Sequence, residues 1–274
     1  MKKKEAPKEE KRTSLSRTLL EINKRYGKTI IGNASSMLDL KMERLSTGVK
    51  VLDDCLGGGF LLGRMVEMFG LPSAGKSVIS LLTIKQAQDK GLDCIIVDAE
   101  KSFDAEFAKK FGVDTAKLIV VDLSIGEEIV DTVAKLLSAQ PGVIVIDSVA
   151  AMVPKEEMEK SAEENTMALR ARLMSRGLAK LNALNKKTLV IWINQMRSTL
   201  AMYGAKNTTT GGRSLGHYSS IRLEVRQGEK LTVDGKKTGE IIGQVIQANC
   251  VKNKTAQPYR QASFKFYYEP IRIE

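Results

Sequence analysis

The residues GLPSAGKS, Gly70 to Ser77, have the types and spacing of a loop that binds phosphates. The pattern Gly-x4-Gly-Lys-Ser follows a strand-like apolar run and opens a helix-like one, which is the context such a loop needs and which disfavours a fortuitous glycine-rich turn. Glycines let backbone N–H groups converge on phosphates, and the helix start adds a favourable dipole. Lys76 would place a charge at the β- and γ-phosphates, and the Ser77 hydroxyl would ligate Mg²⁺. The predicted nucleotide-binding residues are Gly70, Pro72, Ser73, Ala74, Gly75, Lys76, Ser77 and Val78.

Two further apolar runs end in carboxylates. Asp147 closes VIVID, and at the carboxyl end of a parallel strand it would face the ligand crevice and hold Mg²⁺ through water. Asp98 and Glu100 end IIVDAE. Hydrolysis needs a group that orients or deprotonates the attacking water, and Glu100 is the candidate base, with an ordinary surface carboxylate as the alternative.

A third run, TLVIWINQ, ends in the amides Asn194 and Gln195. A neutral amide there could hydrogen-bond a γ-phosphate without repelling it. The segment Met196 to Gly212 that follows has little apolar periodicity and contains TTTGG. A structureless loop of this length is usually functional, so it is predicted to be a switch that nucleotide orders and a partner meets.

Alternating strand and helix patterns predict an α/β fold with a mainly parallel sheet covered by helices. The expected strands are Met65–Phe69, Cys94–Asp98, Leu118–Val121, Val143–Asp147 and Thr188–Ile193, and the expected helices cover 76–90, 104–111, 126–139 and 164–185. Near Ile221 the pattern changes to strands joined by turns such as Val233 to Lys236, which predicts an antiparallel extension.

Charge is concentrated at the start of the chain. The formal net charge is +11; residues 1–28 hold ten Lys/Arg and four Asp/Glu, so they carry +6 and the remainder +5. Residues 1–12 read as a disordered basic tail that either scans nucleic acid or is simply solvated. No apolar run approaches the roughly 20 residues of a membrane span, which predicts a cytoplasmic protein. The three cysteines lack CxxC spacing, and Cys94 reads as a buried small hydrophobe rather than a metal ligand.

An amphipathic helix follows the tail, with Leu15, Leu19, Ile22 and Tyr26 at helical spacing. Such a short helix cannot bury its apolar face alone, so it folds back on its own core or docks on a neighbouring subunit. The predicted organisation is a tail (1–12), an oligomerisation arm (13–45) and an ATPase core (46–274).

From about residue 13 to 268 the chain resembles the bacterial RecA family of homologous recombinases. The matching stretches are LSTGVKVLDDCLGGGF, GRMVEMFGLPSAGKS, DAEKSFDAEFAKKFGVD, VIVIDSVAAMVPKEEME, INQMR, TTTGG and VKNK. The resemblance implies an ATP- and Mg²⁺-dependent helical filament on single-stranded DNA that pairs with homologous double-stranded DNA and exchanges strands.

The resemblance also implies roles for individual residues. Lys76, Ser77, Asp147, Glu100 and Gln195 fall on the family's nucleotide-site positions, in agreement with the roles argued above. Asp104 and Phe107 match positions near the adenine. Lys252 and Lys254 match lysines that reach the ATP of the adjacent subunit, which would make the initial helix the arm that docks on a neighbouring core.

Two segments match the family's DNA-binding loops. The first, Glu157 to Thr166, leads into a helix, and the second is Met196 to Gly212. Small residues and backbone N–H groups can approach phosphates without reading bases. An aliphatic side chain could wedge between stacked bases. The implied DNA contacts are Met167, Arg172, Ser175, Arg197, Leu200, Gly211 and Gly212. For Arg172 the alternative is a solvated charge, and for Met167 a core position.

The chain also departs from the family. The domain that follows the core is absent, so the chain is expected to be either a naturally minimal form, as in phage-like relatives, or a trimmed one. His217 stands where the family has an aromatic, and Asn207 replaces an acidic residue before TTTGG. The alternatives to a recombinase are a ring ATPase of clock or helicase type, a small-molecule kinase, and a binding-only paralogue. TTTGG and VKNK argue against a ring ATPase. The sequence shows no signal of the acceptor pocket or lid that a kinase needs. A binding-only paralogue is disfavoured because every catalytic position is filled.

Overall fold

The computed structural model describes residues 14–26, 31, 43–158, 167–198, 207–233, 235 and 239–274. The chain divides into two compact units, Met1–Lys41 and Met42–Glu274, which are considered separately. None of the helices in these described ranges is long and apolar enough to cross a membrane.

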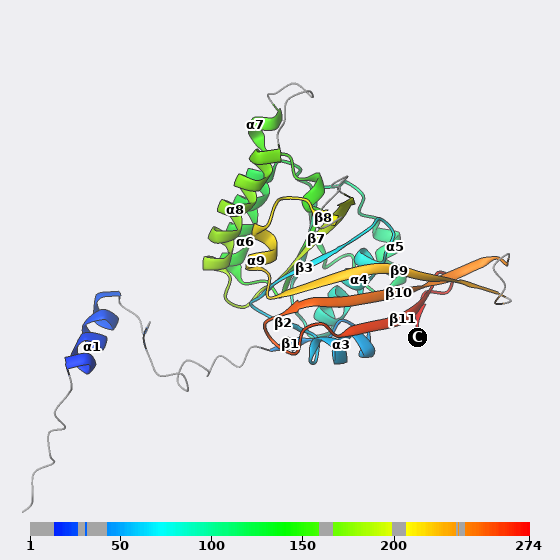
Figure 1. The fold of residues 1–274 in the computed structure, drawn as a ribbon, viewed down its shortest axis with the longest axis horizontal. Coiled ribbons are helices and arrows are strands. Elements are labelled where there is room, and N and C mark those ends of the chain that lie inside the picture. The colour runs from blue at the N-terminus through cyan, green and yellow to red at the C-terminus, as the bar shows by residue number, and fades with distance from the viewer. Residues whose placement is uncertain are drawn as a thin grey trace, which may run out of the picture. The chain divides into compact units, whose positions relative to one another are not determined.

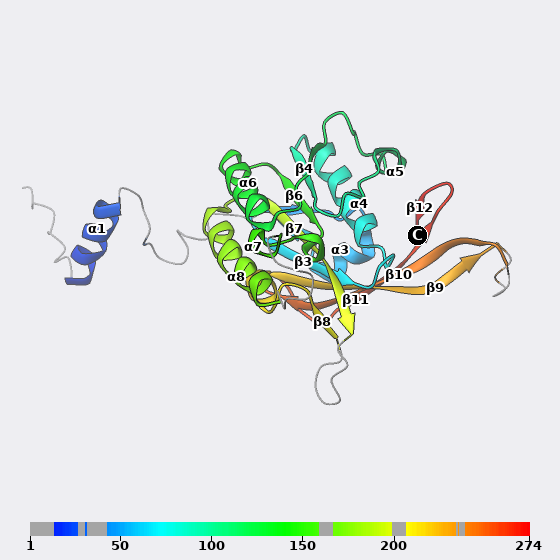
Figure 2. The ribbon, with the colours of Figure 1, turned by 90° about the horizontal axis from the view of Figure 1, so that it is seen from above.

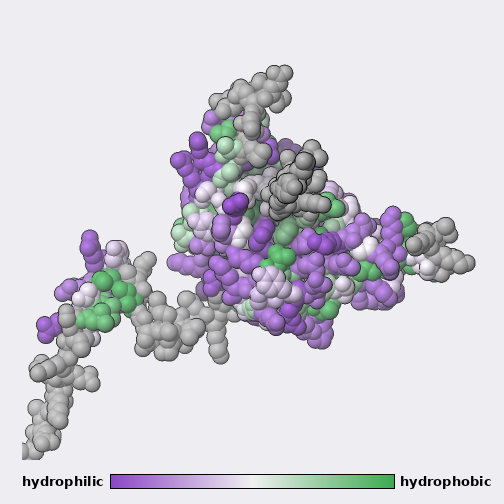
Figure 3. All heavy atoms as spheres, viewed as in Figure 1, coloured by the Kyte–Doolittle hydropathy of each residue, from purple (hydrophilic) through white to green (hydrophobic). Residues whose placement is uncertain are grey.

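The first unit contains helix α1, Ser14–Tyr26. Its amphipathic pattern is the predicted one, and apolar side chains gather on its surface in Figure 3; Leu15 and Leu20 are exposed. Near its end, the Asn23 side chain exchanges two hydrogen bonds of 3.0 Å with the backbone of Ile31, which ties Ile31 to the helix.

The second unit alternates strands and helices, as the sequence predicts. Its strands are β1 (Arg44–Leu45), β2 (Phe60–Leu61), β3 (Met65–Gly70), β4 (Cys94–Asp98), β5 (Ile119–Val121), β6 (Val143–Asp147), β7 (Leu189–Ser198), β8 (Asn207–Thr209), β9 (Ile221–Thr232), β10 (Ile241–Asn253), β11 (Gln261–Tyr267) and β12 (Arg272–Ile273). Its helices are α3 (Lys50–Leu56), α4 (Lys76–Asp89), α5 (Ala105–Lys110), α6 (Gly126–Ala139), η1 (Val149–Ala151), α7 (Lys155–Met158), α8 (Met167–Leu184) and α9 (Ser214–Tyr218).

The main sheet has the order β12-β11-β10-β9-β3-β7-β6-β4-β5. From β9 to β5 neighbouring strands run parallel, whereas β9, β10, β11 and β12 pair antiparallel. β9 and β10 extend beyond the rest of the sheet (Figure 1). This confirms the predicted parallel core with an antiparallel extension.

Each face of the sheet has its own apolar core. One core joins alternate strand residues such as Val66 and Met68 to α3 and α4, while the other joins Met65 and Trp192 to α6 and α8. In Figure 2, α6 and α8 lie side by side, and they contact each other. Because side chains alternate along a strand, neighbouring residues at a strand end serve different faces.

The structure corrects two predicted boundaries. The predicted strand Thr188–Ile193 is longer, since β7 runs to Ser198 and pairs antiparallel with β8, Met196 opposite Thr209. Both ends of the second predicted loop are therefore arms of a hairpin rather than structureless chain. The first predicted loop begins later than Glu157, which belongs to α7.

The close pairing of β10 with β11 generates a test at Gly243. The pairing of β10 with β9 shifts register between Ile241 and Gly243, and a Cβ at Gly243 would lie 2.3 Å from the backbone oxygen of Phe266. A backbone atom cannot rotate away as a side chain can. We expect Gly243→Ala to lower the free energy of unfolding by about 3 kcal/mol, measured by urea denaturation. Gln247→Ala, at an exposed position of the same strand, should change it little; equal effects would contradict the assigned packing.

Candidate nucleotide site and the hairpin beside it

The phosphate loop connects β3 to α4 as predicted. Gly75 has φ +105°, and a Cβ there would lie 2.5 Å from Cδ1 of Ile246. A Cβ at Gly70 would lie 2.0 Å from the backbone oxygen of Val225. These glycines therefore have a packing requirement against β9 and β10 in addition to any approach of phosphate. Pro72, Ser73 and Ala74 lie in the loop between them, and Ser77 and Val78 in the first turn of α4.

Lys76 is buried and its ammonium folds back on the loop. Its Nζ donates hydrogen bonds to the backbone oxygens of Gly70 (3.2 Å) and Leu71 (2.7 Å). Burial lowers the pKa of Lys76, while the charges of Asp147 and Glu100 act to raise it. The pKa of Lys76 is lowered overall, because the effect of burial outweighs that of the two carboxylates.

Asp147 ends β6 beside the first turn of α4. The Ser77 hydroxyl donates to its Oδ2 at 3.3 Å. Burial, and then the charge of Glu100, raise the pKa of Asp147 to about 6, against the opposing effects of Ser77 and Lys76. A hydroxyl and a carboxylate in contact, with surplus negative charge around them, are the hard oxygen ligands that Mg²⁺ prefers, so these residues fit that ion.

Asp98 and Glu100, close in sequence, have different surroundings. Asp98 is buried opposite Asp147 in the β4–β6 pairing, and its oxygens accept from the backbone N–H groups of Ser102 (3.1 Å) and Phe103 (2.9 Å). It fixes the loop after β4. Glu100 is exposed, and its negative charge acts to raise the pKa of both Lys76 and Asp147.

An aromatic-lined cavity of about 460 Å³ adjoins the phosphate loop. It contains Phe107 of α5, as predicted, and also Tyr268, which the sequence reasoning missed. Asp104 lines an adjacent cavity of about 200 Å³ with Ser77 and Asp147. The Oδ1 atom of Asp104 also caps α5 by accepting from the N–H groups of Glu106 and Phe107.

Two glutamines missed by the sequence reasoning support the loop from the antiparallel extension. Gln227 donates to Gln244 (2.6 Å), and Gln244 donates in turn to the backbone oxygen of Ser73 (3.1 Å). Isolated glutamines on strands carry no motif, so the only signal for them is their position in the folded sheet.

The two amides in the middle of β7 lie on opposite faces of the sheet. In the parallel pairing of β3 with β7, Gln195 lies opposite Gly70, where the phosphate loop begins. Ile193 lines the cavity that holds Ser77 and Asp147, and by alternation Gln195 faces the same side. Asn194 is fully buried and donates to Glu67 on the other face. Asn194 therefore does not face the phosphate loop, and the γ-phosphate contact of Gln195 stays a prediction.

Lys252 and Lys254 lie away from this phosphate loop. Lys252 Nζ donates to the backbone oxygens of Gly216 (2.6 Å) and His217 (3.1 Å) at the end of α9. Burial, and then the charges of Lys254 and Arg222, lower the pKa of Lys252. It lines a separate cavity of about 740 Å³ together with His217 and Arg222. Neither lysine lines the cavities around Lys76 and Ser77.

The structure packs the end of the second predicted DNA loop on α8, the helix that follows the first predicted loop. Gly211 and Gly212 have φ values of +87° and +78° and pack on α8, where Cβ atoms would lie 3.0 Å from Met174 Cγ and 3.3 Å from Ala171 Cβ. Arg172 and Ser175 are exposed on the same helix. The backbone of Met167 begins α8 and that of Arg197 lies in β7, but their side chains, and all of Leu200, lie outside the described residues.

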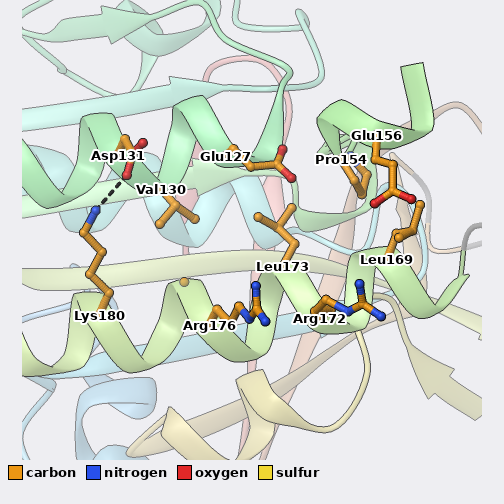
Figure 4. A pocket seen from close by; sticks show the side chains of 11 residues that line it. Glu127, Val130, Asp131, Pro154, Glu156, Leu169, Arg172, Leu173, Arg176 and Lys180 are labelled. Atoms are coloured by element: carbon orange, nitrogen blue, oxygen red, sulfur yellow. Dashed lines mark hydrogen bonds and ion pairs between the residues drawn. The ribbon is translucent and has the colours of Figure 1, made fainter. Parts of the chain in front are cut away.

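Helix α8 also carries basic residues that the sequence reasoning did not select. Figure 4 shows Arg176 beside Arg172 in a groove between α6 and α8, where Lys180 donates to Asp131 at 2.7 Å. Arg170 donates from Nε and Nη2 to both oxygens of Glu157, which joins α7 to α8. Glu157, predicted to begin the first DNA-binding loop, therefore forms an ion pair with Arg170 within the described chain.

Fold and phosphate loop together define an α/β nucleotide-binding protein of the P-loop class. The family model of the RecA N-terminal domain matches residues 13–271. Proteins named Protein RecA are similar to nearly the whole chain. The one from Mesoplasma florum is 39% identical over 264 residues, which cover 94% of this chain and 78% of the relative. Those from Mannheimia haemolytica (40% identical over 265 residues, 95% of this chain and 71% of the relative) and Mycoplasma mycoides (40% identical over 259 residues, 93% of this chain and 74% of the relative) match to a similar extent. The chain belongs to the RecA family of recombinases.

Burial and the charge of Glu100 disfavour the ionised form of Asp147, whereas two backbone N–H groups donate to Asp98. This difference can be tested by measuring stability against pH. The raised pKa of Asp147 means that its ionised form disfavours folding, an effect that grows from about pH 4 to pH 6 and is full above that range. Without nucleotide or divalent cation, Asp147→Asn should raise stability by about 1–2 kcal/mol at pH 8, after allowance for partial solvent exposure, and the gain should vanish near pH 4.

Asp98→Asn is the matched control, since Asp98 accepts two backbone N–H bonds. It should lower stability by about 1–2 kcal/mol at pH 8. Thermal unfolding across this pH range measures both variants. A loss of stability in Asp147→Asn at pH 8 would contradict the assigned electrostatics.

Proposed function

We propose that this chain is a DNA-dependent ATPase that assembles as a filament on single-stranded DNA and pairs it with homologous duplex. One observation carries the proposal: Gly70, where the phosphate loop begins, pairs with Gln195, and β7 continues from Gln195 into the hairpin whose return packs on α8. One continuous strand therefore links the nucleotide site to the predicted DNA surface.

Each group in the nucleotide site has a role that its surroundings support. Lys76 leaves its carbonyl partners to neutralise the β- and γ-phosphates, and the loop N–H groups bind their oxygens. Ser77 and Asp147 hold Mg²⁺, which supplies charge stabilisation of the transferred phosphoryl group when bound. Phe107 and Tyr268 provide apolar surfaces for the base.

Hydrolysis is assigned to Glu100 and Gln195. The exposed Glu100 accepts the proton of the attacking water, since its carboxylate acts electrostatically on both Lys76 and Asp147. Gln195 donates its amide to the γ-phosphate and transmits the presence of that group to β7. DNA that binds the hairpin favours the same position of the Gln195 amide, and in this way DNA binding would stimulate hydrolysis.

The lysines Lys252 and Lys254 complete the site of a neighbouring subunit. Neither lysine lines the cavities around the phosphate loop of its own chain, and Lys252 contacts α9 instead, which supports a role in trans. The exposed apolar side chains of α1 support a second contact between subunits, with this helix docking on a neighbouring core.

Subunit mixing tests the shared site. Lys76→Ala and Lys252→Ala should each abolish ATP hydrolysis in the presence of single-stranded DNA. In an equimolar mixture, random assembly gives about a quarter of interfaces with both lysines intact, so about a quarter of wild-type activity should return. A mixture of wild type with Lys76→Ala calibrates co-assembly. A mixture that co-assembles but remains inactive would show that Lys252 acts within its own subunit or not at all.

The salt dependence of DNA binding tests the surface on α8. A phosphate contact by Arg172 contributes about 0.7 to the slope of log affinity against log salt for single strands. Arg172→Ala should reduce the slope by about that amount on every sequence tested. Lys180→Ala is the control on the same helix, because Asp131 already holds that ammonium. An unchanged slope in Arg172→Ala would exclude the contact.

A further inference from the structure

A buried carboxylate lies at the centre of the sheet. Glu67, in the middle of β3, is completely inaccessible to solvent. Its Oε1 accepts from Asn194 Nδ2 (3.1 Å) and its Oε2 from Arg222 Nε (2.6 Å). In the pairing of β3 with β9, Glu67 lies opposite Arg222. One carboxylate thus joins β3 to the strands on either side of it.

Stability alone is a poor reason for this arrangement. Removing a carboxylate and a guanidinium from water costs several kcal/mol, and apolar residues of similar volume often pack as stably or more so. A carboxylate held by one donor from each neighbouring strand does fix the geometry of the three strands relative to one another. Its role therefore depends on what else Asn194 and Arg222 contact.

Asn194 holds the return of the hairpin. Besides donating to Glu67, its Nδ2 donates to the backbone oxygen of Thr210 at 3.0 Å, and its Oδ1 accepts from the N–H of Gln195 at 2.9 Å. Thr210 directly follows β8 and directly precedes Gly211. This amide therefore connects Glu67 both to the residue beside the phosphate loop and to the point where the hairpin meets α8.

Arg222 extends the same network toward Lys252. Its guanidinium lies 4.7 Å from the centre of the Phe69 ring, one residue before Gly70. It lines the cavity that contains Gly212 and Lys252. The charges of Arg222 and Glu67 act on Lys252 in opposite directions. Loss of the Glu67 charge would therefore leave two cations facing each other at that cavity.

We propose that Glu67 is a positioning residue that, through Asn194 and Arg222, couples the phosphate loop to the hairpin and to Lys252. The inference deepens the proposed function and rests on it. Movement of β3 when nucleotide enters shifts Glu67, and Glu67 shifts Asn194 and the Thr210 carbonyl with it. Binding of DNA at the hairpin acts along the same contacts in reverse, because coupling between two binding sites is reciprocal.

The coupling factor is the quantity to measure. It is the ratio of affinities for a fluorescent oligo-dT, measured by anisotropy, with and without a non-hydrolysable ATP analogue and Mg²⁺. Glu67→Gln preserves volume and an acceptor for Asn194 but loses the charge that Arg222 requires. We expect it to lower the coupling factor by at least about fivefold. Affinity for the analogue without DNA should change less than twofold, which separates coupling from damage to the phosphate site.

Two comparisons keep the test independent of folding defects. Glu224→Gln removes another buried carboxylate, on β9, that pairs with Arg226 at 2.8 Å and lines the same cavity as Arg222. It should leave the coupling factor within twofold of wild type. Arg222→Lys keeps the positive charge but loses the Nε geometry and should resemble Glu67→Gln. The double variant Glu67→Gln/Asn194→Ala should lose no more coupling than its worse single variant, as expected for one path.

Three outcomes would overturn the inference. The first is an unchanged coupling factor in folded Glu67→Gln and Arg222→Lys, while wild type shows coupling. The second is an equal loss of the coupling factor in Glu224→Gln. The third is a loss in the double variant that equals the product of the two single losses. If wild-type DNA affinity does not respond to the analogue at all, the proposed function fails together with this inference.

Discussion

The parallel pairing of β3 with β7 is the contact on which the rest of the structure depends. β3 leads into the phosphate loop, β7 leads into the hairpin, and their hydrogen bonds hold Gly70 opposite Gln195. A slip of this pairing by one residue would move every side chain of the strand to the other face, so the register holds the phosphate loop and the hairpin at a fixed spacing. The helices on both faces protect this pairing from water, and β9 adds a third parallel strand beside the loop.

The two faces of the sheet divide the chemistry. Phosphate-site residues, from Lys76 to Asp147, lie on the side of α4, whereas Glu67, Asn194 and Arg222 lie on the side of α6 and α8. A strand end can serve both because its side chains alternate. Gln195 and Asn194 are the clearest instance, because they are neighbours in sequence and face opposite sides of the sheet.

Much of the fold and half of the site could be predicted from the sequence. Apolar runs ending in Asp98 and Asp147, and the glycines before Lys76, determine local structure by short-range rules, so the parallel sheet and the loop followed from them. The contacts of Glu67 could not, because Arg222 is separated from it by 155 positions and only the strand order brings them together. The same holds for Gln244 behind the loop. The face that Asn194 takes could not be predicted either, because a motif of two amides does not state which side of the sheet each residue faces.

Asp147 gives the site a property beyond charge balance. A carboxyl group with a pKa of about 6 is partly protonated in weakly acidic buffer, and a cation that binds it displaces the proton into solution. The heat absorbed or released on loading the site therefore includes the ionisation enthalpy of whichever buffer takes up that proton. With a cation bound at Asp147 as proposed, calorimetric enthalpies are expected to carry a buffer-dependent component in weakly acidic solution that disappears as the solution becomes alkaline.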